Sequence, residues 1–368
     1  MNHRVLHIIA SLEHSGAAAQ LLSVVAGQVR RGVVVQVVAL RDGGLRHEFL
    51  AVGAKVQLLT RRHRFDPLVA WRLKQLADQG RCSVTHAWDT TSAAFAHAAG
   101  VGPLVVTARN ADEFALDEDW LSQRVARSIR HYLAASQSIA DALLTAGVPS
   151  EQVCLAPPAI SPRTSKAALG KQQAFDELAL PTGARTIAVV GRLVPTKNVR
   201  ELIWCADLVR VLQEDVRLVI FGGGPLRGEL ERFARMVSDR EHIRFVGQRG
   251  DLPDLLPHFE MLWHAGGEAS PPQVVLEAMA AGVPVVADHT PGASEAIVDG
   301  ETGLLVPVAA RAARARVTQQ LFDEPDRRRR LSAAARQRAL ENFNVTNLLD
   351  RFTQAYEAVQ PEYATTTV

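Results

Sequence analysis

Short runs of apolar, β-branched residues alternate with longer stretches of helical periodicity along almost the whole chain. Runs of about four to eight such residues predict buried strands, and strands that alternate with helices predict a parallel sheet covered on both faces. The chain is therefore expected to be α/β. The strands predicted in the first half are Val5–Ile9, Val33–Leu40, Lys55–Leu59, Ser83–Ala87, Leu104–Thr107, Tyr132–Ala135 and Val153–Leu155. The helices predicted between them include Ala18–Arg31, Pro67–Asp78, Trp120–His131 and Ser138–Ala146.

A proline-rich break, Ala156–Arg163, interrupts the alternation and predicts a linker. With 368 residues and about 100–200 residues per domain, two domains are expected. We predict one doubly wound, Rossmann-like domain over residues 1–162 and a second over residues 163–345. The strands predicted after the break are Thr186–Val190, Arg217–Phe221, Ile243–Val246, Met261–His264, Val283–Ala287 and Gly303–Val306. The helices are Asn198–Leu212, Leu226–Val237, Val274–Ala281, Ala309–Phe322, Asp326–Asn342 and Thr346–Val359.

The composition narrows the classes of protein to consider. A net charge of +2 does not point to nucleic acid as a partner, and no segment reaches the ~18 apolar residues of a membrane span. Cys82, Cys154 and Cys205 are widely spaced and form no CxxC pair, so we expect neither disulfides nor zinc, and a reducing cytoplasm fits. The N-terminal apolar run is too short for a signal peptide and predicts a first strand.

The segment that follows the strand at Thr186–Val190 carries two cations. Gly191 permits close approach of the backbone to a ligand, and Asn198 with Glu201 predicts a capping box at a helix N-terminus. Such a helix end attracts anions, and Arg192 and Lys197 add positive charge at the same place. The pattern favours a phosphate site, and two solvated cations on a loop are the alternative.

Three consecutive glycines lie between another strand and helix, in Phe221–Leu226. Gly222 and Gly223 could form a turn that faces a phosphate or a base, or only a tight turn with Pro225 at the helix start. The run is not GxGxxG, and no such motif opens the first domain. This argues against a nicotinamide-dependent dehydrogenase.

The stretch Glu268–Ala287 predicts a short buried helix that begins after Pro272 and stops at Gly282. Glu277 lies inside this helix, and a buried carboxylate needs a partner. The partner would be either a cation of the protein or the hydroxyl groups of a ligand. Near the N-terminus, Gly16 lies at a further strand-to-helix turn that permits close approach of a ligand.

Taken in this order, the motifs resemble those of the GT-B retaining glycosyltransferases of family 4, also called glycosyltransferase group 1. The resemblance covers nearly the whole chain and is most specific over Thr186–Pro307. It implies the GT-B architecture of two tandem Rossmann-like domains, with the acceptor in the first domain and the nucleotide-sugar in the second. The helix over residues 346–360 would cross back onto the first domain. The motifs that carry the resemblance are Gly-Arg-Leu…Lys, Gly-Gly-Gly-Pro, Phe-Val-Gly, Glu-Ala-Met-Ala-x-Gly-x-Pro-Val-Val and Gly-Glu-Thr-Gly-Leu-Leu-Val.

The resemblance also implies roles for single residues. Arg192 and Lys197 would hold the donor diphosphate, and Glu277 would bind the ribose hydroxyls; with Glu268, the two cations are the predicted catalytic residues. No metal or cofactor is expected, because two cations and a helix N-terminus can stabilise a leaving diphosphate. The Gly16 loop would lie against the donor phosphate and the acceptor, and backbone near Arg249 would face the base. The remaining residues expected on the donor side are Gly191, Gly222, Gly223, Gln273 and Val274.

Three positions depart from the pattern of the family. The family usually has two glutamates separated by seven residues, and Ala269 stands where the first is expected, with Glu268 one position early. A one-residue bulge could restore the carboxylate; its loss would weaken donor use roughly ten- to a hundredfold. Arg109 replaces a histidine that many relatives have after the corresponding strand. In the N-terminal loop, Ser15 and Ala18 replace a glycine and an acidic residue.

Polar residues at the strand ends of the first domain are candidates for the acceptor side. His86 and Asp89 follow one strand, and Arg109 follows the next. A hydrogen-bonded structural histidine is the alternative for His86. The acceptor itself is expected to be a glycan, a lipid-linked sugar or a small molecule.

Three arginines in the stretch Glu118–Leu133 lie at helical spacing. Arg124, Arg127 and Arg130 would share one face of a helix, opposite an apolar face. Such a face is either solvated or rests on an anionic membrane surface. The protein is therefore expected to be cytoplasmic, with peripheral contact at the inner membrane face as an open alternative.

Together these features predict a metal-independent retaining glycosyltransferase of the hexosyltransferase type, as in polysaccharide biosynthesis. It would move a hexose-type sugar from a nucleotide-sugar to an acceptor hydroxyl. Two alternatives stay open. One is a non-catalytic GT-B nucleotide-binding partner protein, which the altered acidic pair motivates, and the other is a GT-B sugar-nucleotide epimerase. The sequence names neither the donor nor the acceptor.

Overall fold

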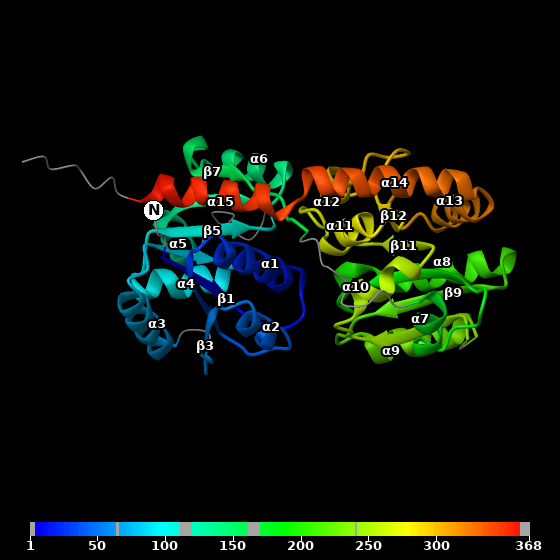
Figure 1. Cartoon of the computed structure of the whole chain (residues 1–368), viewed down its shortest axis with the longest axis horizontal. Helices are drawn as coiled ribbons and strands as arrows, with labels where there is room; N and C mark the ends of the chain where they lie inside the picture. Colours follow the sequence, from blue (N-terminus) through cyan, green and yellow to red (C-terminus); the bar gives the residue numbers. More distant parts are fainter. Residues whose placement is uncertain (1–3, 64–65, 111–119, 161–169, 240, 361–368) are drawn as a thin grey trace, which may run out of the picture. The chain divides into compact units, whose positions relative to one another are not determined.

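The computed structural model describes residues 4–63, 66–110, 120–160, 170–239 and 241–360, without the side chains of residues 120–122 (Figure 1). It divides into two compact units, Met1–Ala159 with Val345–Val368, and Ile160–Asn344. Each unit is built on one parallel sheet. The predicted boundary between residues 162 and 163 falls in the stretch 161–169, which lies outside the described residues.

The first unit contains a seven-stranded sheet in the order β3-β2-β1-β4-β5-β6-β7. The strand order reverses between β1 and β4, and a ligand of such a sheet binds beyond the carboxyl ends of the strands at this switch point. The strands are β1 (Arg4–Ile9), β2 (Val34–Ala39), β3 (Lys55–Leu58), β4 (Val84–Ala87), β5 (Leu104–Ala108), β6 (Ile129–Ala134) and β7 (Val153–Leu155). The helices are α1 (Gly16–Arg30), α2 (Arg46–Ala51), α3 (Pro67–Gly80), α4 (Thr90–Ala99), α5 (Trp120–Ser128), α6 (Gln137–Thr145) and α15 (Val345–Val359).

The second unit contains a six-stranded sheet in the order β10-β9-β8-β11-β12-β13, with its switch point between β8 and β11. The strands are β8 (Arg185–Val190), β9 (Val216–Phe221), β10 (Ile243–Gly247), β11 (Met261–His264), β12 (Val285–Asp288) and β13 (Leu304–Val306). The helices are α7 (Lys171–Glu177), α8 (Val199–Leu212), α9 (Arg227–Val237), α10 (Leu252–Leu255), α11 (Gln273–Ala280), α12 (Pro291–Ala296), α13 (Arg311–Asp323) and α14 (Pro325–Asn342). Every strand predicted from the sequence is present, which confirms two doubly wound sheets.

Alternate residues of the strands in the second unit enter two separate cores. Ile187 and Val189 of β8 pack into one core together with residues of α8, α9 and α13, whereas Ala188 packs into the other with residues of α7, α11 and α14. Both faces of the sheet are therefore covered. This explains why its strands are continuous apolar runs rather than alternating ones.

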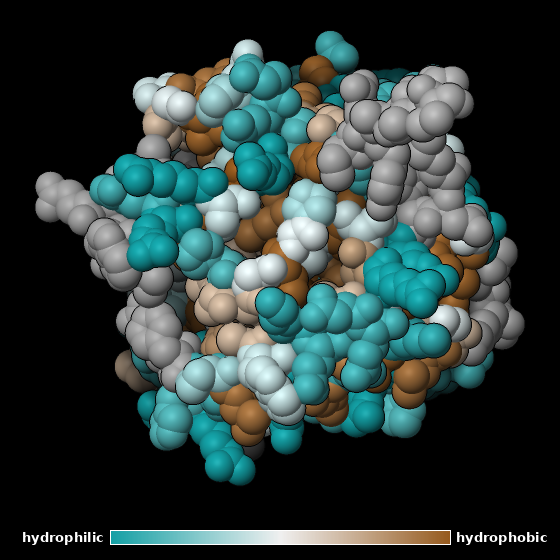
Figure 2. All heavy atoms as spheres, turned by 90° about the vertical axis from the view of Figure 1, so that its left-hand side faces the viewer, coloured by the Kyte–Doolittle hydropathy of each residue, from teal (hydrophilic) through white to brown (hydrophobic). Residues whose placement is uncertain are grey.

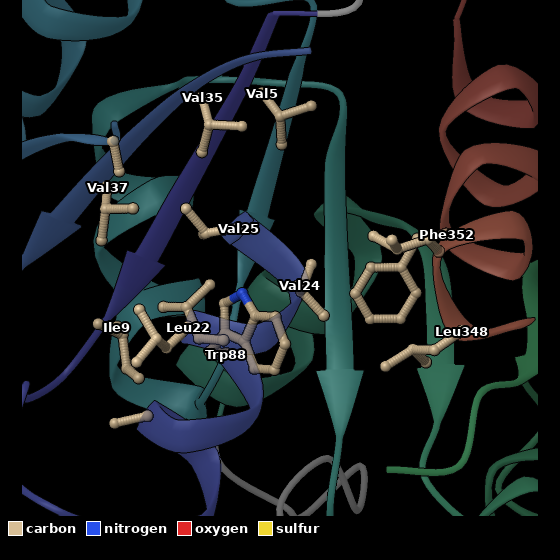
Figure 3. Close-up of a cluster of buried hydrophobic side chains, with 14 of the residues drawn as sticks. Val5, Ile9, Leu22, Val24, Val25, Val35, Val37, Trp88, Leu348 and Phe352 are labelled. Atoms are coloured by element: carbon tan, nitrogen blue, oxygen red, sulfur yellow. The ribbon is translucent and has the colours of Figure 1, made fainter. Parts of the chain in front are cut away.

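The last helix, α15, packs in the first unit although the preceding helices belong to the second. Figure 3 shows Leu348 and Phe352 of α15 beside Val24 and Trp88 in the buried core. At the far end of the helix, the Tyr356 hydroxyl lies 2.7 Å from Nδ1 of His86 on β4. The predicted return of the final helix to the first unit is thus confirmed.

The predicted helix over 120–131 was wrong in its last three residues. The helix α5 ends at Ser128, and Ile129 begins β6, which pairs with β5. Arg130 therefore lies on a strand and shares no helix face with Arg124 and Arg127. The apolar residues of this stretch fit both a helix and a strand, and pairing with β5 decides between them.

Candidate functional site

The loops that follow β8 and β9 are packed on each other through glycines. Gly222 has a φ of +131°, and a Cβ at this position would collide with the carbonyl oxygen of Gly191. A Cβ at Gly224 would lie 2.5 Å from the carbonyl oxygen of Leu193. The glycine run therefore lies close to another backbone segment of the protein itself. The turn holds the Gly191–Leu193 segment against β9, and this supports the tight-turn alternative for Gly222.

Lys197 and Glu268, two of the predicted catalytic residues, form an ion pair. Lys197 ends a short 3-10 turn (Pro195–Lys197), and Glu268 lies in the loop between β11 and α11. Both side chains are partly exposed, at 22% and 29%. The Glu268 side chain thus reaches the lysine that is predicted to bind phosphate, although Glu268 lies one position before Ala269, where the acid is expected.

The stem of Lys197 lies across the switch point of the second unit. A Cβ added to Gly191, directly after β8, would lie 4.0 Å from Cδ of Lys197, and one added to Gly266, after β11, would lie 3.6 Å from it. Gly266 also has a φ of +123°, and its Cβ would lie 2.6 Å from the carbonyl oxygen of Thr196. The ammonium group is therefore held where ligands of doubly wound sheets bind.

The loop that carries Glu268 is also fixed on its far side. The amide of Gly292, at the start of α12, donates to the carbonyl oxygen of Glu268 over 3.0 Å. A Cβ at Gly292 would collide with the carbonyl oxygen of Ser270. Gly266 and Gly292 are thus required by contacts between distant segments, which no local pattern indicates.

His264, the last residue of β11, was missed from the sequence. It is 3% exposed, and its Nε2 lies 3.7 Å from the second carboxylate oxygen of Glu268. Burial lowers the pKa of His264 to about 3, with further lowering from Lys197 and Arg314. The ring is therefore neutral at pH 7. Its position at a strand end, one residue before the Gly266-Gly267-Glu268 segment, is the sequence signal that could have indicated it.

Arg192 is exposed and lies two residues beyond β8. Among the residues that the structure describes, its guanidinium has no hydrogen-bond or ion-pair partner. A cation that no acidic group neutralises is available to an anionic ligand. Arg192 and Lys197 thus lie at the carboxyl end of β8, followed by the N-terminus of α8.

The predicted capping box at α8 was wrong, although the helix does begin at Val199. Asn198 adopts a left-handed backbone (φ 45°, ψ 32°) and makes no side-chain cap, whereas a capping residue has an extended backbone. Glu201 instead accepts hydrogen bonds from Arg311 of α13, the closer at 2.5 Å, and this contact lowers the pKa of Glu201.

The helix α11 begins at Gln273, directly after Pro272 and one residue before the predicted start at Val274. Gly282, with a φ of +73°, lies just beyond its end. Glu277 is only half-buried, because the buried face of α11 is formed by the neighbouring apolar residues. The Gln273 amide donates to Oε1 of Glu277 over 3.3 Å. Gln273 and Val274 lie in the first turn, where backbone N–H groups have no partner within the helix.

The Arg249 side chain is held by acidic groups of the protein. It donates to both carboxylate oxygens of Asp251, at 2.8 and 2.5 Å, and to Glu177 of α7 at 2.9 Å. These contacts raise the pKa of Arg249 and lower that of Asp251. The prediction for Arg249 concerned its backbone, which these side-chain contacts do not involve, and it stays a prediction.

In the first unit, Gly16 is the first residue of α1, and the Ser15 hydroxyl accepts from the Ala18 amide over 3.2 Å. Ser15 therefore supplies the N-cap of the helix, a function that the glycine it replaces could not perform with a side chain. The Ala18 side chain is fully buried, so an acidic group at this position would lie in the core.

Asp89 and Arg109 also bond to neighbouring elements of the first unit. Asp89 caps α4 by accepting from the Ser92 amide over 2.8 Å, and its other oxygen accepts from the Ala10 amide over 2.8 Å. Arg109 donates to Oε1 of Gln20 over 2.6 Å. Both side chains are half-buried and lie at the carboxyl ends of strands.

His86 has no exposed surface and lies in a buried polar network. Its Nε2 lies 2.8 Å from the Thr107 hydroxyl, and its Nδ1 lies 2.7 Å from that of Tyr356. Burial lowers the pKa of His86 well below its usual value, with a smaller contribution from His7. The contacts to β5 and α15 support the structural alternative for this histidine.

In the part of the chain that the structure describes, no group of three or more His, Cys, Asp or Glu is placed to hold a metal ion. No described helix is both long and apolar enough to span a bilayer. Figure 2 shows one face of the molecule, on which hydrophilic and hydrophobic side chains are interspersed, as is normal for protein surfaces.

Two family models match the chain, one for each half. The model described as Glycosyltransferase Family 4 matches residues 14–164, and that described as Glycosyl transferases group 1 matches residues 170–338. With two sheets of the GT-B type, these matches show that the chain belongs to the GT-B glycosyltransferases of family 4.

The proteins similar to this chain include two curated relatives and one solved structure that bear on its function. The GDP-mannose-dependent α-(1-6)-phosphatidylinositol monomannoside mannosyltransferase of Mycolicibacterium smegmatis is 34% identical over 173 residues, 44% of this chain and 45% of the relative. The glycogen synthase of Mycobacterium tuberculosis is 30% identical over 188 residues, 49% of this chain and 44% of the relative. The chain thus aligns with less than half the length of these relatives. The structure of Anabaena Alr3699/HepE in complex with UDP-glucose is similar in fold, with a TM-score of 0.80 and 19% identity, over 96% of this chain and 99% of that one.

Proposed function

We propose that this protein transfers a hexose-type sugar from a nucleotide-sugar to an acceptor hydroxyl, with retention of configuration and without a metal. The observation that carries the proposal is the Lys197–Glu268 ion pair over the switch point of the second unit, with Arg192, which has no ion-pair partner among the described residues, at the end of the same strand β8. The relative named as GDP-mannose-dependent and the structural neighbour in complex with UDP-glucose support a nucleotide-sugar as donor.

The donor diphosphate would be held at the carboxyl end of β8. At about 4 Å and an effective dielectric near 20, each cation–phosphate contact contributes about 4 kcal/mol before desolvation. Arg192 and Lys197 supply two such contacts, and the N-terminus of α8 adds unpaired backbone N–H groups. These groups stabilise the charge that develops on the leaving diphosphate, which is the role a metal ion would otherwise have.

Lys197 would exchange partners when the donor binds. In the structure its ammonium group is paired with Glu268, and a diphosphate with at least two negative charges competes for it. Glu268 would then be released toward the sugar hydroxyls, beside the neutral ring of His264. Glu268 would thus take the part of the acid expected at Ala269, and this supports an active enzyme over a non-catalytic partner protein.

The chemical step would break the bond between the anomeric carbon and the phosphate oxygen and form one to the acceptor oxygen. The proton of the acceptor hydroxyl would pass to the departing phosphate on the same face, which retains the configuration. Glu277 would bind the ribose hydroxyls from α11, and the acceptor would bind at the first unit. We propose a glycan, a lipid-linked sugar or a small molecule as the acceptor.

A binding experiment tests the diphosphate site. Nucleoside diphosphates should bind at least about tenfold more tightly than the matching monophosphates, because the second phosphate adds a charge-assisted contact of about 1.5–3 kcal/mol. Isothermal titration with UDP, GDP and ADP against UMP, GMP and AMP measures this ratio. Equal affinity within each pair, or no binding of any nucleotide, would contradict the assignment of Arg192 and Lys197.

A further inference from the structure

Arg314 of α13 is a charged side chain placed in the core of the second unit. The residue is 4% exposed, and its side chain contacts the ends of two strands. It donates to the carbonyl oxygens of Val286 on β12, at 2.8 Å, and of His264 on β11, at 3.2 Å. A buried guanidinium needs such partners, because an unpaired one would be strongly destabilising.

Asp288, the last residue of β12, connects Arg314 to the loop after β11. Its Oδ1 accepts from the Arg314 guanidinium over 2.5 Å, and its Oδ2 accepts from the backbone amide of Gly266 over 3.3 Å. The Asp288 side chain is 4% exposed. Both oxygens of one buried carboxylate are thus used, one on the arginine and one on the first residues of the loop.

Gly266, which donates to Asp288, also contacts residues of the candidate site. Its Cα faces the carbonyl oxygen of Thr196 and the stem of Lys197, so its position sets the space that Lys197 occupies. Glu268 follows two residues later and pairs with Lys197. The connection therefore runs from Arg314 through Asp288 and Gly266 to the ion pair, with each step a hydrogen bond or a packing contact.

We propose that Arg314 and Asp288 are positioning residues, which hold the loop Gly266–Ser270 so that Glu268 and Lys197 meet at the donor. The inference rests on the proposed function of that pair. A purely stabilising role is the competing explanation. However, a buried ion pair is weak evidence for stability, because its desolvation offsets most of its attraction, and apolar replacements of similar size are often neutral. What an apolar pair cannot reproduce are the hydrogen bonds to the strand ends and to the loop, namely those of Arg314 to the carbonyl oxygens of Val286 and His264 and that of Asp288 to the amide of Gly266.

The experiment uses this difference. The double variant Arg314→Met/Asp288→Leu removes the ion pair, the contact to Gly266 and the hydrogen bonds of Arg314 to the two strand ends, while it fills the space with apolar side chains. Asp288→Asn, a milder variant, keeps the size of the side chain and replaces one acceptor by a donor. The control is Arg328→Met/Glu260→Gln, which removes a second ion pair (3.2 Å), in this case only partly buried, at the opposite end of β11, directly before Met261.

Two measurements are made on each full-length variant: amide hydrogen exchange of the 266–270 segment, and kcat together with the dissociation constant of the nucleoside diphosphate. We expect the amides of 266–270 to exchange at least about tenfold faster and kcat to fall at least about tenfold, since small misplacements of reacting groups are costly. The dissociation constant should change less than about threefold, because Arg192 remains in place. The control should behave as the wild type in both measurements.

Several outcomes would overturn the inference. Wild-type exchange in Asp288→Asn and the double variant would show that the contact does not hold the loop. Faster exchange with unchanged kcat, or an equal loss of kcat in the control, would leave only a general role in stability. If the wild type turns over no donor, the proposed function fails, whereas hydrogen exchange still decides whether Arg314 and Asp288 hold the loop.

Discussion

Lys197→Ala is expected to lower kcat for donor turnover about 100-fold or more, because removal of one group that stabilises developing charge has effects of this order. Two consequences of the ion pair add to the loss. The variant lacks one of the two cations proposed for the diphosphate, and it leaves the Glu268 carboxylate unpaired where the phosphates would bind. Affinity for the nucleoside diphosphate should therefore fall as well. Arg192→Ala should weaken that affinity roughly ten- to a hundredfold, as for a single charge-assisted contact.

The measurement is steady-state turnover with nucleotide titration for each variant. Arg200→Ala is the matched control: Arg200 lies in the first turn of α8, but it is paired with Glu229 at 3.4 Å, and both side chains are more than half exposed. Its removal should change kcat and affinity less than about twofold, since surface pairs contribute little. Unchanged turnover and affinity in both Lys197→Ala and Arg192→Ala would show that the donor phosphates bind elsewhere.

Gly222→Ala is expected to destabilise the second unit by about 3 kcal/mol or more. The added Cβ would collide with the carbonyl oxygen of Gly191, and neither backbone segment can move without shifting a strand of the central sheet. The φ of +131° at Gly222 adds backbone strain, which for such regions is about 1–3 kcal/mol. Thermal and urea unfolding of the variant would show the loss, and failure to obtain folded protein is its extreme form.

The neighbouring glycine provides the control. A Cβ at Gly223 would meet nothing closer than the Gln248 side chain at 3.8 Å, an ordinary contact. Gly223→Ala should therefore change the free energy of unfolding by less than about 1 kcal/mol. If Gly222→Ala is as stable as Gly223→Ala, the packing of the two loops is not as described, and the glycine run regains its ligand-facing interpretation.

The strands, and the position of Arg192 and Lys197 at the carboxyl end of one of them, could be predicted because their signals are local. A buried parallel strand is a short apolar run, and Arg192 and Lys197 stand beside a glycine at the end of such a run. Local signals also misled where two structures share one pattern. The residues after Ser128 fit a helix until pairing with β5 is known, and Asn198 has the right residue type but the wrong backbone for a cap.

The residues that hold the loops of the site in place could not be predicted, because their role depends on contacts between distant segments. Arg314 lies 50 residues beyond His264 in sequence and 26 beyond Asp288, yet it contacts both. In sequence it is one of several arginines on a polar helix, and nothing marks it as buried. Gly266 and Gly292 likewise look like ordinary loop glycines until the carbonyl groups that they face are located.

Proton NMR of donor and product tests the central claim most directly. The wild-type protein would be incubated with UDP- and GDP-hexoses and with candidate glycan, lipid-linked and small-molecule acceptors, while the anomeric proton is followed. The account predicts that one donor is consumed, nucleoside diphosphate is released, and the transferred sugar keeps the anomeric configuration of the donor. An inverted product would contradict retention. A nucleotide that binds without any turnover would indicate the non-catalytic partner protein, and a sugar that changes while it remains on the intact donor would indicate the epimerase.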